Sequence, residues 1–96
     1  MLDHRMTFPD DFDDYAWEVE AKGWFSGAVL SVAGKDYPLN FYDPVRLSQS
    51  IEDELERGSS FCEPNLIVVR AVTRSQMEGA VRDMVKSGQV GSLFVE

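Results

Sequence analysis

The only cysteine and the only histidine of the chain, Cys62 and His4, are the first residues to consider for catalysis. Thiol nucleophiles need a base within hydrogen-bond reach, or a positive neighbourhood that lowers the thiol pKa. His4 is distant from Cys62 in sequence, and the carboxylate of the adjacent Glu63 would oppose thiolate formation. We therefore expect Cys62 to be a loop residue and expect no catalytic residue of this type.

The run DDFDDY at residues 10–15 is dense in carboxylates, which are the ligands that calcium prefers. Calcium loops, however, place their ligands at fixed offsets, turn sharply at a glycine and close with a distant glutamate. No glycine lies between Asp10 and Glu20. The spacing therefore argues against a specific metal site, and we expect no metal and no cofactor.

Gly88 and Gly91 form the G-x-x-G spacing that one class of nucleic-acid clamp uses. That clamp requires a second helix after the loop and basic surroundings, whereas this chain continues as SLFVE and is acidic. A helix end followed by a turn accounts for both glycines.

Alternation of apolar and polar residues predicts three strands in the first half of the chain. In YAWEVEAK, at residues 15–22, Trp17 and Val19 share one face while Glu18 and Glu20 share the other. FSGAVLSV at 25–32 and YPLNFY at 37–42 alternate in the same way, separated by the turn signal AGKD. We expect an antiparallel meander over residues 15–42, with an edge or a bulge at Pro38, which has no N–H to donate.

Residues 44–57 have the signals of an amphipathic helix. Asp43 is a favourable N-cap, Pro44 a favourable first residue and Gly58 a favourable terminator. The acidic run at 52–56 is then the solvated side of this helix, not a site. The apolar stripe of the helix is formed by Leu47, Ile51 and Leu55.

The second half of the chain predicts one buried strand, one helix and a last strand. LIVVRAV at 66–72 is a continuous apolar run, typical of a central strand covered on both faces. Thr73 or Ser75 caps a helix whose stripe includes Met77 and Val81, and SLFVE ends the chain as a strand. The prediction is an α+β fold of order βββαβαβ, with a mixed five-stranded sheet and two helices on one face. We expect residues 1–14 to be a flexible acidic arm and residues 15–96 to form a single domain.

Composition favours a globular protein, with 44% hydrophobic and 27% charged residues and a net charge of −8. An acidic surface repels nucleic acids and anionic lipids, so we expect neither as a partner. Residues 1–15 lack the features of a secretory signal, and no apolar run reaches the roughly 20 residues of a membrane-spanning helix. The single cysteine suits a reducing compartment, and we expect the protein to be cytoplasmic.

The charge distribution leads to one preferred function, a non-catalytic module that binds a basic surface of a partner protein. Small acidic immunity proteins and antitoxins that block nucleases act in this way, an analogy of size and charge alone. If the helices leave one sheet face open, the aromatic residues Trp24, Phe25 and Tyr42 lie on that face or seal the hairpin ends. The residues expected to bind the partner are Asp10, Asp11, Phe12, Asp13, Asp14, Tyr15, Trp17, Glu18 and Glu20.

Two alternatives remain open at the level of sequence. The first is a self-assembling accessory subunit, a homodimer through an exposed sheet face or an edge strand. The second is a small-molecule enzyme that pairs Glu18 or Glu20 with Tyr42, which would require a buried carboxylate with a raised pKa.

Overall fold

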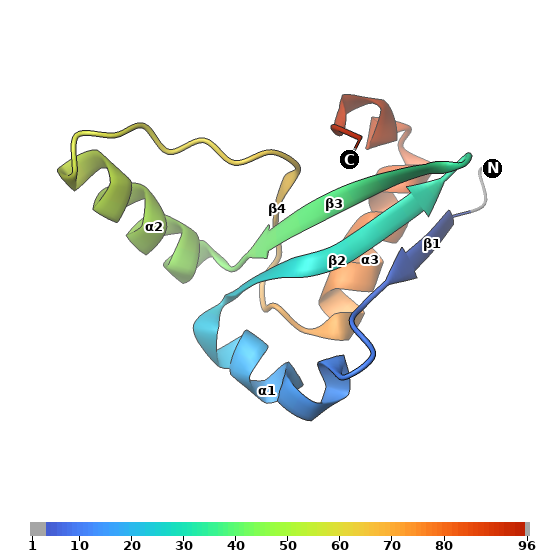
Figure 1. Cartoon of the computed structure of the whole chain (residues 1–96), viewed down its shortest axis with the longest axis horizontal. Helices are drawn as coiled ribbons and strands as arrows, with labels where there is room; N and C mark the ends of the chain where they lie inside the picture. The colour runs from blue at the N-terminus through green and yellow to red at the C-terminus, as the bar shows by residue number, and fades with distance from the viewer. Residues whose placement is uncertain (1–3, 96) are drawn as a thin grey trace.

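A computed structural model of the chain describes residues 4–95 and has a mixed α+β fold (Figure 1). The sheet has four strands in the order β1-β2-β3-β4. Their bounds are β1 His4–Thr7, β2 Trp24–Val32, β3 Lys35–Tyr42 and β4 Leu66–Val68. The helices are α1 Phe12–Lys22, α2 Pro44–Glu56 and α3 Arg74–Lys86, followed by the 3-10 helix η1 at Gln89–Ser92.

The hairpin of β2 and β3 forms the centre of the sheet, and its strands are the longest. Antiparallel pairing aligns Leu30 with Tyr37 and Phe25 with Phe41, with a bulge between Phe25 and Ala28. β1 pairs antiparallel with β2, and β4 pairs parallel with β3. Ala33 and Gly34 form the hairpin turn with positive φ angles of 54° and 78°, the conformation that a two-residue hairpin loop requires.

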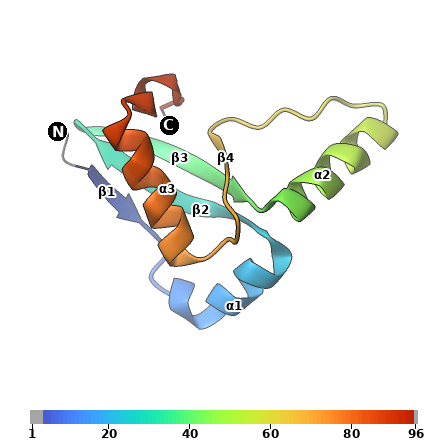
Figure 2. The same ribbon diagram turned by 180° about the vertical axis from the view of Figure 1, so that it is seen from behind.

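Helix α3 covers one face of this sheet, as Figure 2 shows from behind. Thr73 caps its N-terminus by accepting a hydrogen bond from the Gln76 amide at 3.3 Å. Its buried residues Met77, Val81 and Val85 follow the predicted stripe. They meet the inward-facing residues of the hairpin, among which Leu30, Leu39 and Phe41 are fully buried. The main core therefore lies between the β2–β3 hairpin and α3.

The prediction from the sequence is wrong about the number and order of the strands. The first predicted strand is part of a helix, and the last predicted strand is irregular. Residues 15–22 belong to α1, where Phe12, Ala16 and Val19 recur at the spacing of one helix face and pack on the core. Two acidic residues in the first turn also favour a helix N-terminus, and Gly23 ends α1 in the left-handed conformation at φ 73°. A side chain at Gly23 would fall on the Asp43 carboxylate.

The C-terminal segment also differs from the prediction of a last strand. After η1, the chain is held by Asn65, whose side chain donates to the carbonyls of Pro38 and Phe94 at 2.7 and 2.8 Å and accepts from the Phe94 amide at 2.7 Å. Asn65 is only 8% exposed and has a positive φ of 53°. The Asn65 carboxamide thus fixes Phe94, at a position where the sequence predicted the backbone hydrogen bonds of a strand.

β4 is a short edge strand and not a central strand. Only Leu66–Val68 pair with β3, the other edge of β4 has no strand beside it in the described part of the chain, and Val68 is exposed. A run of apolar residues therefore signals burial only for some of its members: Val69 and Val72 are buried in the core beyond the end of the strand.

Residues 4–12 lie within the segment expected to be a flexible arm, and they contribute a strand and two core residues instead. Phe8 and Phe12 have ring centroids 4.9 Å apart, and Phe12 meets Phe25 edge to face at 5.0 Å. Burial of these rings anchors the segment to the sheet. Residues 1–3 of the expected arm lie outside the described residues.

Helix α2 is the other departure from the predicted architecture. Its caps are as predicted, since the Asp43 carboxylate accepts from the Arg46 amide at 2.7 Å and Pro44 is the first residue. Of its 13 residues, all of which the structure describes, none is buried. Figures 1 and 2 show α2 extending away from the sheet, so α2 does not lie beside α3 on the face where both helices were expected.

Candidate functional site

The carboxylates predicted to bind a partner lie on α1 and on the turn before it. The exposed side of α1 has a tryptophan among acidic residues, and we call this surface the Trp17 face. It consists of Asp13, Asp14, Trp17, Glu18 and Glu20, all of which are exposed. Asp10 and Asp11, also exposed, extend it at the start of the helix.

Trp17 is the centre of this surface, and 69% of the side chain is accessible to solvent. Glu20 and Ala21 follow it by three and four residues and therefore lie on the neighbouring turn, whereas Asp13 and Asp14 precede the break in the helix at Tyr15. Tyr15 departs from helical angles (φ −127°, ψ 18°) and separates the first turn from the remainder of α1. The exposure of the indole on a helix that also exposes carboxylates is therefore a property of the fold and not of the sequence order alone.

Two of the predicted residues lie beneath the Trp17 face. Phe12 is 1% exposed and is a core residue, so it cannot contact a partner. Tyr15 is half-buried, and its partial burial, with the nearby Asp11 carboxylate, raises the pKa of its phenol. Phe12 packs against Phe8 and Phe25, Tyr15 packs against Phe12, and these contacts position the helix.

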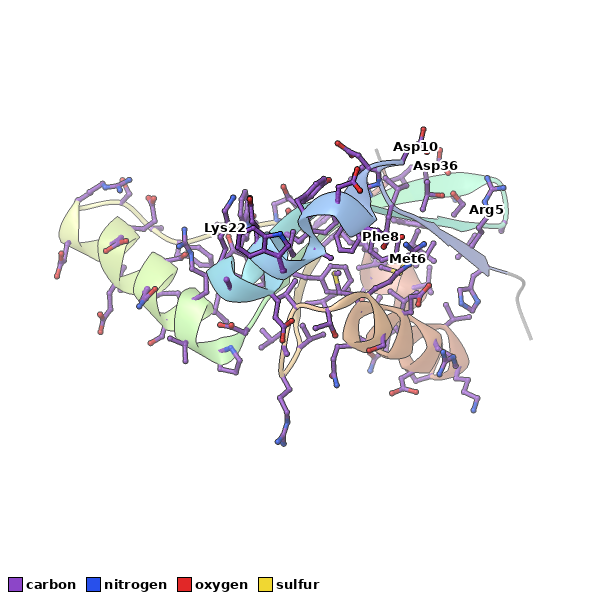
Figure 3. The ribbon with its side chains drawn as sticks, turned by 90° about the horizontal axis from the view of Figure 1, so that it is seen from below. Arg5, Met6, Phe8, Asp10, Lys22 and Asp36 are labelled. Carbon is purple, nitrogen blue, oxygen red and sulfur yellow. The ribbon has the colours of Figure 1, made fainter. Side chains whose placement is uncertain are left out.

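Arg74, at the start of α3, connects the Trp17 face to the body of the protein. Its guanidinium lies 4.6 Å from the centroid of the Phe8 ring and its Nη1 atom is 3.3 Å from Oδ1 of Asp13. Figure 3 shows Phe8 and Met6 on the side of the sheet that α3 covers, and Asp10 and Asp36 on the opposite side. The Arg74 contacts could not be predicted, because 61 residues separate Arg74 from Asp13.

Asp13 is therefore the one member of the Trp17 face with a cationic partner in the described part of the chain. Among residues 4–95, no cationic side chain forms an ion pair with Asp14, Glu18 or Glu20. Lys22 ends α1 on the side toward α2, as Figure 3 shows, and bounds the acidic surface there.

A second feature is a groove of about 400 Å³ between α2 and residues 60–63. At its inner end the Tyr42 hydroxyl donates to Oε2 of Glu63 at 2.5 Å, and the Phe61 ring meets Tyr42 edge to face. Arg46 of α2 and Arg57, the C-cap residue of that helix, line it together with polar and acidic residues. The full lining is Tyr42, Arg46, Ser50, Asp53, Glu54, Arg57, Ser60, Phe61, Cys62 and Glu63.

The electrostatics of Tyr42 make it a structural group at neutral pH. Burial, reinforced by the hydrogen bond to Glu63 and by its negative charge, raises the pKa of Tyr42 to about 12. Arg46 and the indole N–H of Trp24 act in the opposite direction, although the Trp24 N–H does not reach hydrogen-bond geometry with any acceptor among the described residues. A phenol with a raised pKa keeps its proton and is a poor general base near pH 7.

The aromatic residues expected at the open sheet face are largely covered. Phe25 and Tyr42 are buried and Trp24 is half-buried, so these side chains seal the end of the β2–β3 hairpin. They are not available as a binding surface.

The enzyme alternative combined Tyr42 with Glu18 or Glu20, and the structure does not bring these residues together. Glu18 and Glu20 are exposed on α1, whereas the groove at Tyr42 receives its carboxylates from α2 and from Glu63. Over residues 4–95, no cluster of three or more potential metal ligands forms. Cys62 is exposed at the rim of the groove.

In the part of the chain that the structure describes, no helix has both the length and the apolar composition needed to cross a bilayer. Comparison of the chain with known protein families, with curated proteins and with solved structures found no match.

Proposed function

We propose that this protein is a non-catalytic binding module that places the Trp17 face against a basic surface of a partner protein. The observation on which this proposal depends is the exposure of Trp17 among unpaired carboxylates on a helix that is itself anchored in the core. The proposed binding surface is the one predicted from the sequence, except that Phe12 and Tyr15 lie beneath it and support it.

The exposure of the indole supports a role in binding. Trp is the residue most enriched among the energetically dominant positions of protein interfaces, where it fills a pocket of the partner and is surrounded by weaker polar contacts. A Trp ring also attracts cationic side chains to its face. Trp17 has the position of such an anchor, and its acidic neighbours Asp14, Glu18 and Glu20 have the position of the surrounding contacts.

The anchoring of α1 supports tight binding because little order would be lost on association. Phe12 and Val19 are buried in the core, and at its end the Asp43 amide donates to the Gly23 carbonyl at 2.9 Å. The Trp17 face is therefore carried by a segment that is attached to the core near its start and at its end.

The charge of the chain supports a basic partner. A net charge of −8 attracts cationic surfaces over distances longer than a contact and raises association rates. Carboxylates of this density can also occupy a groove that a nuclease uses for phosphates, which is the chemistry of the immunity and antitoxin class. The free, exposed Cys62 is consistent with the cytoplasmic location that we propose for this interaction.

The experiment that tests this proposal compares two triple charge reversals. One set changes Asp14, Glu18 and Glu20 to Lys on α1; the matched control changes Glu52, Asp53 and Glu56 to Lys on α2, with the same change in net charge. Proteins from the native host that bind the unmodified chain are first identified by affinity capture, with Trp17→Ala as the reference that should lose the specific partner. Association rates with that partner are then measured at low and high salt.

We expect the α1 set to slow association about tenfold or more at low salt, with a smaller effect at high salt where charges are screened. The α2 set should have a much smaller effect. Equal effects of the two sets, or a partner retained by Trp17→Ala, would show that the Trp17 face is not the binding surface.

A further inference from the structure

The free edge of β4 carries backbone groups that no other element satisfies. At the two ends of this strand, the Asn65 carbonyl and the Val69 amide form hydrogen bonds with β3, at 3.1 and 2.9 Å. Backbone groups alternate in direction along a strand, so Leu66 and Val68 direct their N–H and C=O groups away from β3. Among residues 4–95, no backbone hydrogen bond from another element reaches these groups.

A groove of about 390 Å³ lies between this edge and α3, and we call it the β4–α3 groove. Figure 2 shows both elements in front of the β2–β3 hairpin. From Ser75 to Asp83, which both line the groove, α3 rises about 12 Å. An extended segment of about four residues has this length. The full lining is Val68, Val69, Arg70, Ser75, Gln76, Gly79, Ala80 and Asp83.

Gly79 keeps the groove open at the middle of α3. Its backbone is helical, and a Cβ at this position would meet no atom within 4 Å. Alanine is more favourable than glycine inside a helix, so neither the helix nor the core requires a glycine here. A glycine does allow the backbone of another chain to approach α3 closely.

The charges that line the groove indicate which segment would fit it. Arg70 lies where β4 leads into α3, and Asp83 lies about two turns beyond the start of the helix lining. Among residues 4–95, neither side chain forms an ion pair. A segment with an acidic residue next to Arg70 and a basic residue next to Asp83 would complement both charges.

We propose that the β4–α3 groove binds an extended segment of another protein, which adds to the free edge of β4 as a fifth strand. Alternate residues of this segment bond to Leu66 and Val68. Its side chains point in turn toward Gly79 in the groove and toward the Val68 side chain, which is 48% exposed, so apolar residues suit both directions. The groove lies on different elements from the Trp17 face, and the proposal does not depend on the function proposed above.

A second copy of the chain fits this groove less well than a free segment does. Paired at this edge, the β4 of a second copy would direct Ile67 and Val69 toward α3, and its own core already packs both residues. A free segment has all its side chains available. The edge offers two amides and two carbonyls, from Leu66 and Val68, and each hydrogen bond makes only a modest net contribution. We therefore expect a dissociation constant of about 10 μM to 1 mM.

A phage-displayed library of random linear heptapeptides, selected on the full chain, provides the probe, and fluorescence anisotropy of the selected peptides measures their affinity. Gly79→Leu and Gly91→Leu are matched substitutions, since a Cβ at either glycine would meet no atom within 4 Å, but only Gly79 lines the groove. We expect Gly79→Leu to weaken binding about tenfold or more and Gly91→Leu to leave it nearly unchanged.

The selected sequences should have apolar residues between an acidic residue at one end and a basic residue at the other. Peptides that Trp17→Ala no longer binds belong to the Trp17 face. A library that yields only such peptides, no peptide at all, or only peptides that the two glycine variants bind equally would overturn the proposal.

Methylation of single backbone amides in a selected peptide tests the strand geometry, because only every second amide of a docked strand faces β4. We expect losses of about tenfold at every second position and small effects at the positions between. Val68→Pro removes a donor from the free edge while the hydrogen bonds to β3 remain, and it should also weaken binding. Similar losses at consecutive peptide positions would exclude strand addition. A dimer of the unmodified chain that Val68→Pro abolishes, measured by sedimentation velocity, would show that a second copy occupies the edge instead.

Discussion

Helices α1 and α2 are similar in length and both are acidic, but the protein uses them in opposite ways. α1 buries Phe12 and Val19 in the core and exposes a tryptophan among its carboxylates. α2 buries no residue and exposes part of its apolar stripe. The helix with the clearer amphipathic pattern is the one that the body of the protein covers less.

The difference teaches that an apolar stripe predicts a helix but not what covers the stripe. The apolar stripe of α1 is short, yet it packs on the core. This is because β1 and β2, the strands before and after α1 in the chain, pair with each other. α2 leaves the end of β3 and is followed by residues 57–65, which run back to β4 along its polar side (Figure 1). The direction in which a connecting segment leaves the sheet, and not the periodicity of the helix, decides which surface it buries.

The largest effect that separates the two helices should come from truncating their apolar residues. We expect Phe12→Ala to lower the free energy of unfolding by about 3–5 kcal/mol, because it removes a fully buried ring from a cluster of aromatic residues. Ile51→Ala on α2 should cost about 1 kcal/mol or less, since its side chain is only half-buried. Urea denaturation at low protein concentration measures both. A comparable loss from the two substitutions would mean that α2 is part of the core.

A smaller effect should appear where α2 joins the sheet, at Tyr42. The pKa of the Tyr42 phenol is raised from 10.0 to about 12 by the fold. The protonated phenol therefore stabilises the folded state fully below pH 10, and this stabilisation is lost as the pH rises through 12. Its magnitude is on the order of 2 kcal/mol. We expect the difference in stability between the unmodified protein and Tyr42→Phe to shrink between pH 9 and pH 12 in denaturation experiments. A difference that stays constant over this range would show that the phenol is not the titrating group.

The smallest effect should come from the helix caps. Asp43→Ala removes the acceptor for the Arg46 amide, and Thr73→Ala removes the equivalent acceptor at the start of α3. Each cap contributes about 1 kcal/mol. Because α3 is packed on the sheet and α2 is not, we expect Thr73→Ala to lower global stability and Asp43→Ala mainly to accelerate amide hydrogen exchange in the first turns of α2. Faster exchange throughout the chain after Asp43→Ala would contradict this separation.

Local signals predicted the parts of the fold that neighbouring residues determine. Asp43 and Pro44 at the start of α2, Thr73 at the start of α3 and the hairpin of β2 and β3 are all as expected. Each of these features depends on residues within one turn or one strand, where capping and alternation act directly.

The errors arose where two periodicities overlap or where a distant partner decides the structure. Residues 15–22 alternate, but Phe12, Ala16 and Val19 also match one face of a helix, and burial against Phe8 and Phe25 decides between the two. The C-terminal segment is set by Asn65, 29 residues away from Phe94. No local pattern reports either contact.

The same error inverted the expected geometry of the candidate site. A strand would place Trp17 on the buried face with Val19, opposite Glu18 and Glu20. The helix instead places Trp17 on the exposed side, beside the carboxylates. Charge and aromatic content therefore select the residues of the candidate site, whereas the exposure of the tryptophan follows only from the fold.

The position of Cys62 has a practical consequence. It is the only thiol of the chain, it is exposed, and it lies at the rim of the groove beside α2. A fluorescent or spin label attached there would be a single-site reporter, without any engineered change, of the environment of the groove between α2 and residues 60–63.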